Sequence, residues 1–194
     1  MNKVSNREKI LNEGLRVVHE HGYANASVRD IVEAAGVPQG SFTNHFASKE
    51  AFGLEIIDIY FAHSRKLIAE TLRNDALPPL QRLRDFIGRG KNRLSEKDMR
   101  CGCLYGNFAA EASDSSELIR NRLIEIFGEV QESLAYCLRA AVKTGEVPSD
   151  LDCNEVAGFI VSSLQGANLL AKAYRNQKTV DRFQHILFSR VLRK

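Results

Sequence analysis

The segment PQGSFTNHF, residues 38–46, carries side chains whose types and spacing suit contact with DNA bases. Gln39 and Asn44 end in amides, and an amide can form two hydrogen bonds with the edge of adenine. Thr43 offers a hydroxyl or a methyl group to a base. The segment therefore predicts a short helix that reads bases in the major groove.

The other residues of this segment fit the same interpretation. Phe42 and Phe46 are four positions apart, so both would face a hydrophobic core. Gly40 and Ser41 are small, and they keep the helix slim enough for a groove about 12 Å wide. Residues around the edge of the motif are candidates for phosphate contacts, which position a protein on DNA without selecting a sequence: Ser27, Arg29, His45 and Lys49.

A second group of reactive side chains lies in residues 99–120, which contain Cys101 and Cys103. Cys103 lies near the predicted start of a short helix and close to Arg100. A helix N-terminus and a nearby cation both stabilise a thiolate, the nucleophilic and oxidisable form of cysteine. The same pattern also suits a buried cysteine that acts as a small hydrophobic residue. On the residues alone, a sensor and a core residue are both open.

An enzyme is the main alternative class, for example a small thiol oxidoreductase built on Cys101 and Cys103; a helical adaptor protein is another. One Cys-x-Cys pair without clustered histidines is a weak metal motif. Residues 88–91, Gly-Arg-Gly-Lys, make an incomplete phosphate loop, because Asp85 and Asn92 replace required residues. The sequence therefore predicts no metal, no cofactor and no enzymatic activity.

The elements that must position these groups are helices throughout, because apolar residues recur at helical spacing and no sustained alternation appears. The fold class is thus predicted to be all-α. Expected N-caps are Ser5, Ser27, Ser48, Asp114 and Asp152. The predicted helices cover 6–21, 27–35, 38–46, 49–73, 115–144 and 152–176, with others after Pro79, around Phe108 and from Thr179.

The two short helices on either side of Gly36 match helix-turn-helix geometry, and the helix 6–21 supplies an apolar platform beneath them. This arrangement predicts a three-helix DNA-binding domain in residues 1–48. A helical regulatory and dimerisation domain would follow in residues 49–194. A helical hairpin with a polar face but no DNA binding gives the same local pattern.

The composition sets broad limits. The chain has 194 residues, of which 44% are hydrophobic and 26% are charged, so it is globular. The net charge of +3 is too small to assign the protein to DNA by itself. No apolar run reaches the ~18–20 residues of a membrane span. The four cysteines are expected as thiols, and we expect a soluble, cytoplasmic protein.

Residues 7–54 closely resemble the DNA-binding domain of the TetR family of bacterial transcriptional regulators. The resemblance rests on HGY at 21–23, SVRDIVEAAGV at 27–37, QGSF at 39–42, HF at 45–46 and SKEAF at 48–52. It implies a helix-turn-helix domain followed by an all-helical domain that senses a ligand and dimerises.

Carried over by position, the resemblance places eight residues at the DNA. Family members usually have tyrosine where this chain has Thr43, so the backbone contact of that tyrosine is in doubt. Gln39, Gly40, Ser41, Thr43 and Asn44 fall on the recognition helix, Ser27 and Arg29 at the start of the preceding helix, and Lys49 at the start of a helix that contacts phosphate.

Three further segments resemble the subgroup around the N-ethylmaleimide reductase repressor: GCL at 102–104, AAEASDSSELIR after it, and GANLLAK at 166–172. That subgroup is associated with reactive electrophiles and oxidants, and its cysteine matches Cys103. Lys172 also falls at a matching place. A buried lysine near a thiol would lower the thiol pKa by its charge.

Reversible binding of a small apolar or aromatic inducer is the other sensing mode. A homodimer is expected, because one helix-turn-helix makes few contacts and an operator carries two half-sites. In either sensing mode the inducer would favour a conformation in which the two reading helices are wrongly spaced for these half-sites. The dimer is predicted to form through the helices near 115–144 and 152–176, where small residues would allow close approach. The family resemblance favours repression of a palindromic operator. Candidate pocket residues are Phe61, Phe86, Tyr105, Asn107, Phe108 and Tyr174.

Overall fold

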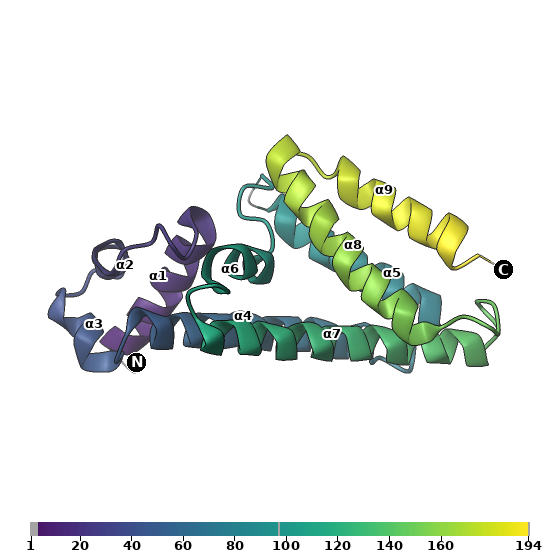
Figure 1. Cartoon of the computed structure of the whole chain (residues 1–194), viewed down its shortest axis with the longest axis horizontal. Coiled ribbons are helices and arrows are strands. Elements are labelled where there is room, and N and C mark those ends of the chain that lie inside the picture. The colour runs from purple at the N-terminus through teal and green to yellow at the C-terminus, as the bar shows by residue number, and fades with distance from the viewer. Residues whose placement is uncertain (1–3, 97, 194) are drawn as a thin grey trace. The chain divides into compact units, whose positions relative to one another are not determined.

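The computed structural model describes residues 4–96 and 98–193, and these residues form helices and connecting turns without a strand (Figure 1). The all-α prediction is confirmed. The predicted domains also include residues 1–3, 97 and 194, which lie outside the described residues. The helices are α1 Asn6–His21, α2 Val28–Ala34, α3 Gly40–His45, α4 Lys49–Glu70, α5 Pro79–Ser95, α6 Leu104–Ala112, α7 Glu117–Lys143, α8 Cys153–Tyr174 and α9 Lys178–Ile186, followed by a π-helical turn, η1, at Leu187–Val191.

Local capping explains where most helices begin. Ser5 and Glu8 form a reciprocal capping box at α1, as predicted. Asp152 accepts hydrogen bonds from two backbone N–H groups at the start of α8, also as predicted. The cap predicted at Asp114 is wrong: Ser116 Oγ accepts the Ile119 N–H at 3.1 Å, so α7 begins at Glu117.

The helix predicted for 49–73 is three residues shorter in the structure, because α4 ends at Glu70. The residues that follow form turns stabilised by backbone hydrogen bonds, with Arg73 N–H donating to Ile68 O at 3.0 Å and Asn74 N–H to Thr71 O at 2.9 Å. The prolines predicted to interrupt the helices lie beyond this turn, and Pro79 occupies the first position of α5.

The chain forms two compact units. The first contains the residues up to Ala62 together with Leu104–Ile124, so it holds α1, α2, α3, α6 and the N-terminal parts of α4 and α7. It therefore extends beyond the predicted DNA-binding domain of residues 1–48. The second unit contains His63–Cys103 and the residues from Glu125 onward.

The core of the first unit depends on a close approach between α1 and α4. Phe52 and Ile31 are fully buried, and they pack against Gly14. A Cβ atom at Gly14 would lie 2.4 Å from Phe52 Cζ, so only glycine allows this packing. The platform predicted for the helix 6–21 is thus present in α1, and it also includes Ile10, Leu11, Val17 and Val18.

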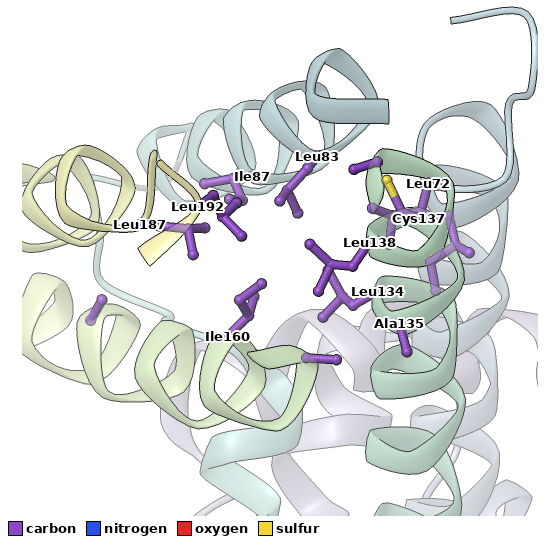
Figure 2. Packing of buried hydrophobic residues seen from close by; sticks show 14 of the residues in the cluster. Leu72, Leu83, Ile87, Leu134, Ala135, Cys137, Leu138, Ile160, Leu187 and Leu192 are labelled. Atoms are coloured by element: carbon purple, nitrogen blue, oxygen red, sulfur yellow. The ribbon is translucent and has the colours of Figure 1, made fainter. Parts of the chain in front are cut away.

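The core of the second unit is drawn in Figure 2. Apolar side chains from α5, α7, α8 and the C-terminal turn meet there, including Leu83, Ile87, Leu134, Leu138, Ile160, Leu187 and Leu192. Cys137 lies in this cluster, where burial raises the pKa of its thiol to about 11. This cysteine therefore stays protonated and apolar at neutral pH.

A buried arginine fixes the turn between α4 and α5. Arg82 is only 5% exposed. Its Nε donates to Leu77 O at 2.6 Å, and its guanidinium pairs with Asp75. Tyr136 donates its hydroxyl to the same carboxylate at 2.8 Å. The hydrogen bond from Tyr136 and, to a smaller extent, the one from Arg82 lower the pKa of Asp75, which stabilises the ionised carboxylate.

No helix among the described residues is both long and apolar enough to cross a membrane.

Candidate nucleic-acid interface

An aromatic cluster holds α3 on the rest of its unit. The ring of Phe42 lies 5.1 Å from that of Phe46 and 5.3 Å from that of Phe52, measured between centroids. All three side chains are at most 3% exposed. The prediction that Phe42 and Phe46 face the core is confirmed, and their burial fixes which face of α3 points outward.

A glycine in the left-handed conformation and two backbone hydrogen bonds form the turn between α2 and α3. Gly36 has φ +62°, a left-handed conformation that a glycine adopts without strain. The Val37 N–H donates to Val32 O at 3.1 Å, and the Gly36 N–H donates to Glu33 O at 3.1 Å. These bonds end α2, and the Ser41 N–H donates to Pro38 O at 2.9 Å where α3 begins. Two helices separated by so few residues have the geometry of a helix-turn-helix pair.

The outward face of α3 carries four of the residues predicted to contact bases: Gln39, Gly40, Thr43 and Asn44, all of them exposed. Gln39 precedes the first residue of α3, and its side chain makes no capping hydrogen bond. A Cβ atom at Gly40 would have no other atom within 4 Å, so the missing side chain serves no packing purpose inside the protein. The face is polar, narrow and open.

Ser41 differs from the other predicted contacts, because it is only 8% exposed. It lies in α3 beside Phe42 and is buried with it. A buried hydroxyl cannot reach a base edge without a change in the helix. Ser41 is therefore better placed to support α3 than to contact a base.

The predicted phosphate contacts lie around α3 in different surroundings. Arg29 and His45 are exposed. Ser27 is exposed too, but its hydroxyl donates to Asp30 Oδ2 at 2.6 Å and accepts from the Asp30 N–H, so it serves mainly as the N-cap of α2. The hydrogen bonds from Ser27 lower the pKa of Asp30, which favours the ionised carboxylate of this capping box.

Lys49 is half-buried rather than extended into solvent. Its Nζ donates to Ala24 O at 3.3 Å and lies 4.8 Å from the centre of the Tyr23 ring. Partial burial lowers the pKa of Lys49, while the charges of Glu111 and Asp30 act in the opposite direction. Its ammonium group is thus held near the turn between α1 and α2.

Sequence reasoning missed the residues of α6 that support this turn. Glu111 accepts a hydrogen bond from the Ala24 N–H at 2.9 Å, and its carboxylate occupies the space beside Gly22. Phe108 stacks against Tyr23 with ring centroids 4.7 Å apart. These partners lie more than eighty residues apart in the sequence. No local spacing pattern indicates them.

The candidate sensor residues lie in the second unit. Cys103 is half-buried and directly precedes α6, and Lys172 is half-buried on α8. The position of Cys103 next to a helix start is confirmed, while its reaction with an electrophile stays a prediction. Among the described residues no group of three His, Cys, Asp or Glu side chains could hold a metal ion.

The predicted pocket residues are divided between the two units. Phe61, Tyr105, Asn107 and Phe108 belong to the first unit, while Phe86 and Tyr174 belong to the second. The rings of Phe61 and Tyr105 lie 6.2 Å apart and both are buried. Tyr174 is 62% exposed at the end of α8, which does not suit the wall of an enclosed pocket.

A helix-turn-helix pair on a supporting helix, with an exposed polar face on its second helix, is the arrangement with which helix-turn-helix proteins bind DNA. Residues 10–56 match the family described as "Bacterial regulatory proteins, tetR family". Residues 79–187 match the "Tetracyclin repressor-like, C-terminal domain". The chain belongs to the TetR family, and it is a DNA-binding transcriptional regulator.

Several known proteins are similar to this chain over most of their length. The HTH-type transcriptional repressor DhaR of Mycobacterium sp. (strain GP1) is 36% identical over 186 residues, covering 96% of this chain and 92% of DhaR. The regulatory protein TetR from Rhodobacter sphaeroides, known from a crystal structure, is 30% identical in sequence. Its structure matches this one with a TM-score of 0.88, and the match covers 93% of this chain and 95% of that protein. Escherichia coli NemR, solved in its reduced form, is 25% identical, with a TM-score of 0.82 over 91% of this chain and 92% of NemR.

Proposed function

We propose that this regulator is a repressor that binds a palindromic operator as a homodimer and leaves it when an inducer acts on the regulatory part of the chain. In this proposal residues 1–48 bind DNA, and residues 49–194 dimerise and sense the inducer. The observation that carries the proposal is the outward face of α3, polar and open, opposite a buried aromatic cluster. Each α3 would lie in the major groove of one half-site.

Contacts to phosphate would hold α3 in register. Arg29 is exposed on α2 and His45 is exposed at the end of α3, while Lys49 is held near the turn between α1 and α2 by Ala24 O. Such contacts position a helix-turn-helix without reading bases, and they make the affinity depend on salt. An Arg29→Ala variant should therefore bind all duplexes more weakly and show a smaller salt dependence.

A surface formed by α8 and α9 supports the dimer. The two helices lie side by side (Figure 1), and Thr179 donates its hydroxyl to Ala167 O at 2.8 Å. A groove of about 390 Å³ runs between them. Its apolar lining includes Phe159, Leu170 and Ile186, each 44–45% exposed. Exposed apolar side chains of this size mark a surface that a partner covers.

This surface differs from the predicted pair of helices near 115–144 and 152–176. The second of these ranges corresponds to α8 and stays in the proposal. The first corresponds to α7, whose residues Leu134 and Leu138 are buried in the core of its own unit. We therefore propose α8 and α9 as the dimer surface. Of the small residues on α8, Gly166 has open space beside it, whereas Gly158 packs against Gln131.

Sedimentation of the full-length protein tests this surface. A Phe159→Glu/Ile186→Glu variant should sediment as a monomer, because both substitutions place charge in the apolar groove. A Leu118→Glu variant is the matched control, because Leu118 is also exposed and apolar but lies on α7 in the other unit. A double variant that stays dimeric would exclude α8 and α9 as the interface.

Two sensing modes remain in the proposal. In the first, an electrophile or oxidant modifies Cys103, with Lys172 as a candidate source of positive charge. The half-buried position of Cys103 before α6 and the similarity to NemR support this mode. In the second, an apolar molecule binds reversibly near Phe61, Tyr105 and Phe108. A Cys103→Ser variant separates them: loss of the response to every electrophile supports the first mode, and an unchanged response excludes it.

Footprinting on DNA upstream of the protein's own gene tests the main proposal. We expect two protected half-sites about 34–36 Å apart, related by two-fold symmetry. Protection should disappear when an active inducer is added. A protein that protects no duplex at low salt would contradict the proposal.

A further inference from the structure

We infer that α3 reads A·T base pairs, so that the bases facing it in each half-site of the operator are adenines and thymines. This inference rests on the proposed function, because it requires α3 to lie in the major groove. It adds the base composition of the DNA that the protein selects. The argument uses the hydrogen-bonding state of three exposed side chains.

The first step concerns Thr43. Its Oγ1 donates a hydrogen bond to Gly40 O at 3.1 Å, within α3 itself. The hydroxyl proton is therefore already used, so Oγ1 can only accept from a base, and the methyl group is the other part of this exposed side chain that can contact one. In the major groove the apolar group that such a methyl contacts is the C5-methyl of thymine. Thr43 thus favours an A·T pair.

The second step concerns the two amides. Within the part of the chain that the structure describes, the side chains of Gln39 and Asn44 make no hydrogen bond, and both residues are exposed. Each amide keeps a donor and an acceptor available. Adenine presents the matching pair, the N7 acceptor and the N6 donor, on its major-groove edge. Both residues therefore favour adenine.

The third step concerns the residue types that α3 lacks. Arginine and lysine read guanine through O6 and N7, and aspartate and glutamate accept from cytosine N4. The sequence of α3, GSFTNH, contains none of these four, and neither does the preceding Gln39. Apart from the exposed imidazole of His45, which the proposed function assigns to phosphate, the helix therefore has no side chain suited to selecting a G·C pair. Arg29 is exposed on α2, outside α3, and the proposed function assigns it to phosphate.

Selection from a random duplex library tests the inference with the full-length protein. We expect A·T pairs at the positions that α3 faces. Those positions are identified by repeating the selection with Gln39→Ala and Asn44→Ala variants, whose preferences should disappear there. Enrichment of G·C pairs at these positions would overturn the inference and leave the proposed function intact. Failure to retain any duplex at low salt would overturn both.

Thr43 allows a sharper test with matched variants. Thr43→Val keeps the methyl group and loses the hydroxyl, whereas Thr43→Ser keeps the hydroxyl and loses the methyl. On the selected duplex the valine variant should bind like the wild type, and the serine variant about 4-fold more weakly for each half-site, the effect of one buried methyl.

Replacing the contacted thymine with deoxyuracil removes the methyl from the DNA instead. The wild type should then bind as weakly as the serine variant, and the serine variant should be unaffected. Equal losses for both proteins would show that a group other than Thr43 contacts the thymine methyl. A loss in the valine variant alone on the selected duplex would show that Thr43 acts through its hydroxyl. Either result would overturn this part of the inference. All three proteins should give the same circular dichroism spectrum, because position 43 is exposed.

Discussion

Gly40 offers a test of the interface that separates folding from DNA binding. The residue is exposed, and a Cβ atom there would meet no other atom within 4 Å. A larger side chain therefore fits the isolated protein. The same side chain would stand between Gln39 and Asn44 on the face that we place against the bases. We predict that Gly40→Leu folds normally and binds its operator poorly.

The two effects have opposite signs. Replacing a helical glycine with a good helix former raises the free energy of unfolding by up to about 0.5–1 kcal/mol. On DNA, each bidentate contact between an amide and a base is worth about 1–3 kcal/mol of discrimination. If the new side chain disrupts one such contact in each half-site, a dimer loses about 2–6 kcal/mol. This loss corresponds to a weakening of about 30-fold or more.

The assay is fluorescence anisotropy on the selected duplex, with thermal unfolding measured on the same samples. Gly128→Leu is the control, because Gly128 is also exposed on a helix with open space around it, but lies on α7. The control should gain similar stability and keep its affinity. If Gly40→Leu binds the operator as tightly as the control does, α3 does not lie against the bases and the reasoning fails.

Three further predictions concern stability. Gly14→Ala should lower the free energy of unfolding by about 1–3 kcal/mol in urea denaturation, because the new Cβ would lie 2.4 Å from Phe52 Cζ; an unchanged midpoint would contradict this packing. Glu111→Ala should lower the free energy of unfolding by about 0.5–1.5 kcal/mol, because the Ala24 N–H loses its acceptor. Glu111→Gln keeps an acceptor, so in thermal unfolding it should recover most of this loss. Burial raises the pKa of Cys137 from 9.0 to about 11, so the unfolded thiol ionises first and the free energy of unfolding falls as pH rises from about 9 to about 11. Cys137→Ala should show a shallower decline over that range, and equal slopes would refute the burial effect.

Much of the first unit follows from local sequence rules. The capping box of Ser5 and Glu8 and the stop at Gly22 give the bounds of α1, because both signals act within one helical turn. The outward face of α3 follows from the spacing of Phe42 and Phe46, since two buried rings four residues apart leave only one face for solvent.

Other features depend on contacts that no local pattern encodes. The half-buried state of Lys49 comes from Ala24 and Tyr23, which precede it by about 25 residues, and the support of that turn comes from Glu111 on α6. The burial of Ser41 depends on how α3 packs against its neighbours. A short polar residue next to a buried phenylalanine gives no sign of which side it will face.

The apolar surface of α8 and α9 was also beyond the sequence. Apolar residues at helical spacing predict one buried stripe, but they do not say whether the chain's own core or a second copy covers it. Phe159 and Ile186 turn out to be exposed, whereas Leu134 and Leu138 on α7 fill the core of their own unit. The tertiary packing of α7 therefore decides which helices remain available to a partner.

The salt dependence of operator affinity in a Gln39→Ala/Asn44→Ala variant tests the central claim most directly. Amides that read bases confer discrimination but release no counterions, so the slope of log affinity against log salt should match that of the wild type. The ratio between affinities for the selected duplex and a scrambled one should fall steeply, because only the Thr43 methyl is then left to distinguish the two duplexes. If that ratio is retained while both affinities fall together, the outward face of α3 does not read the sequence.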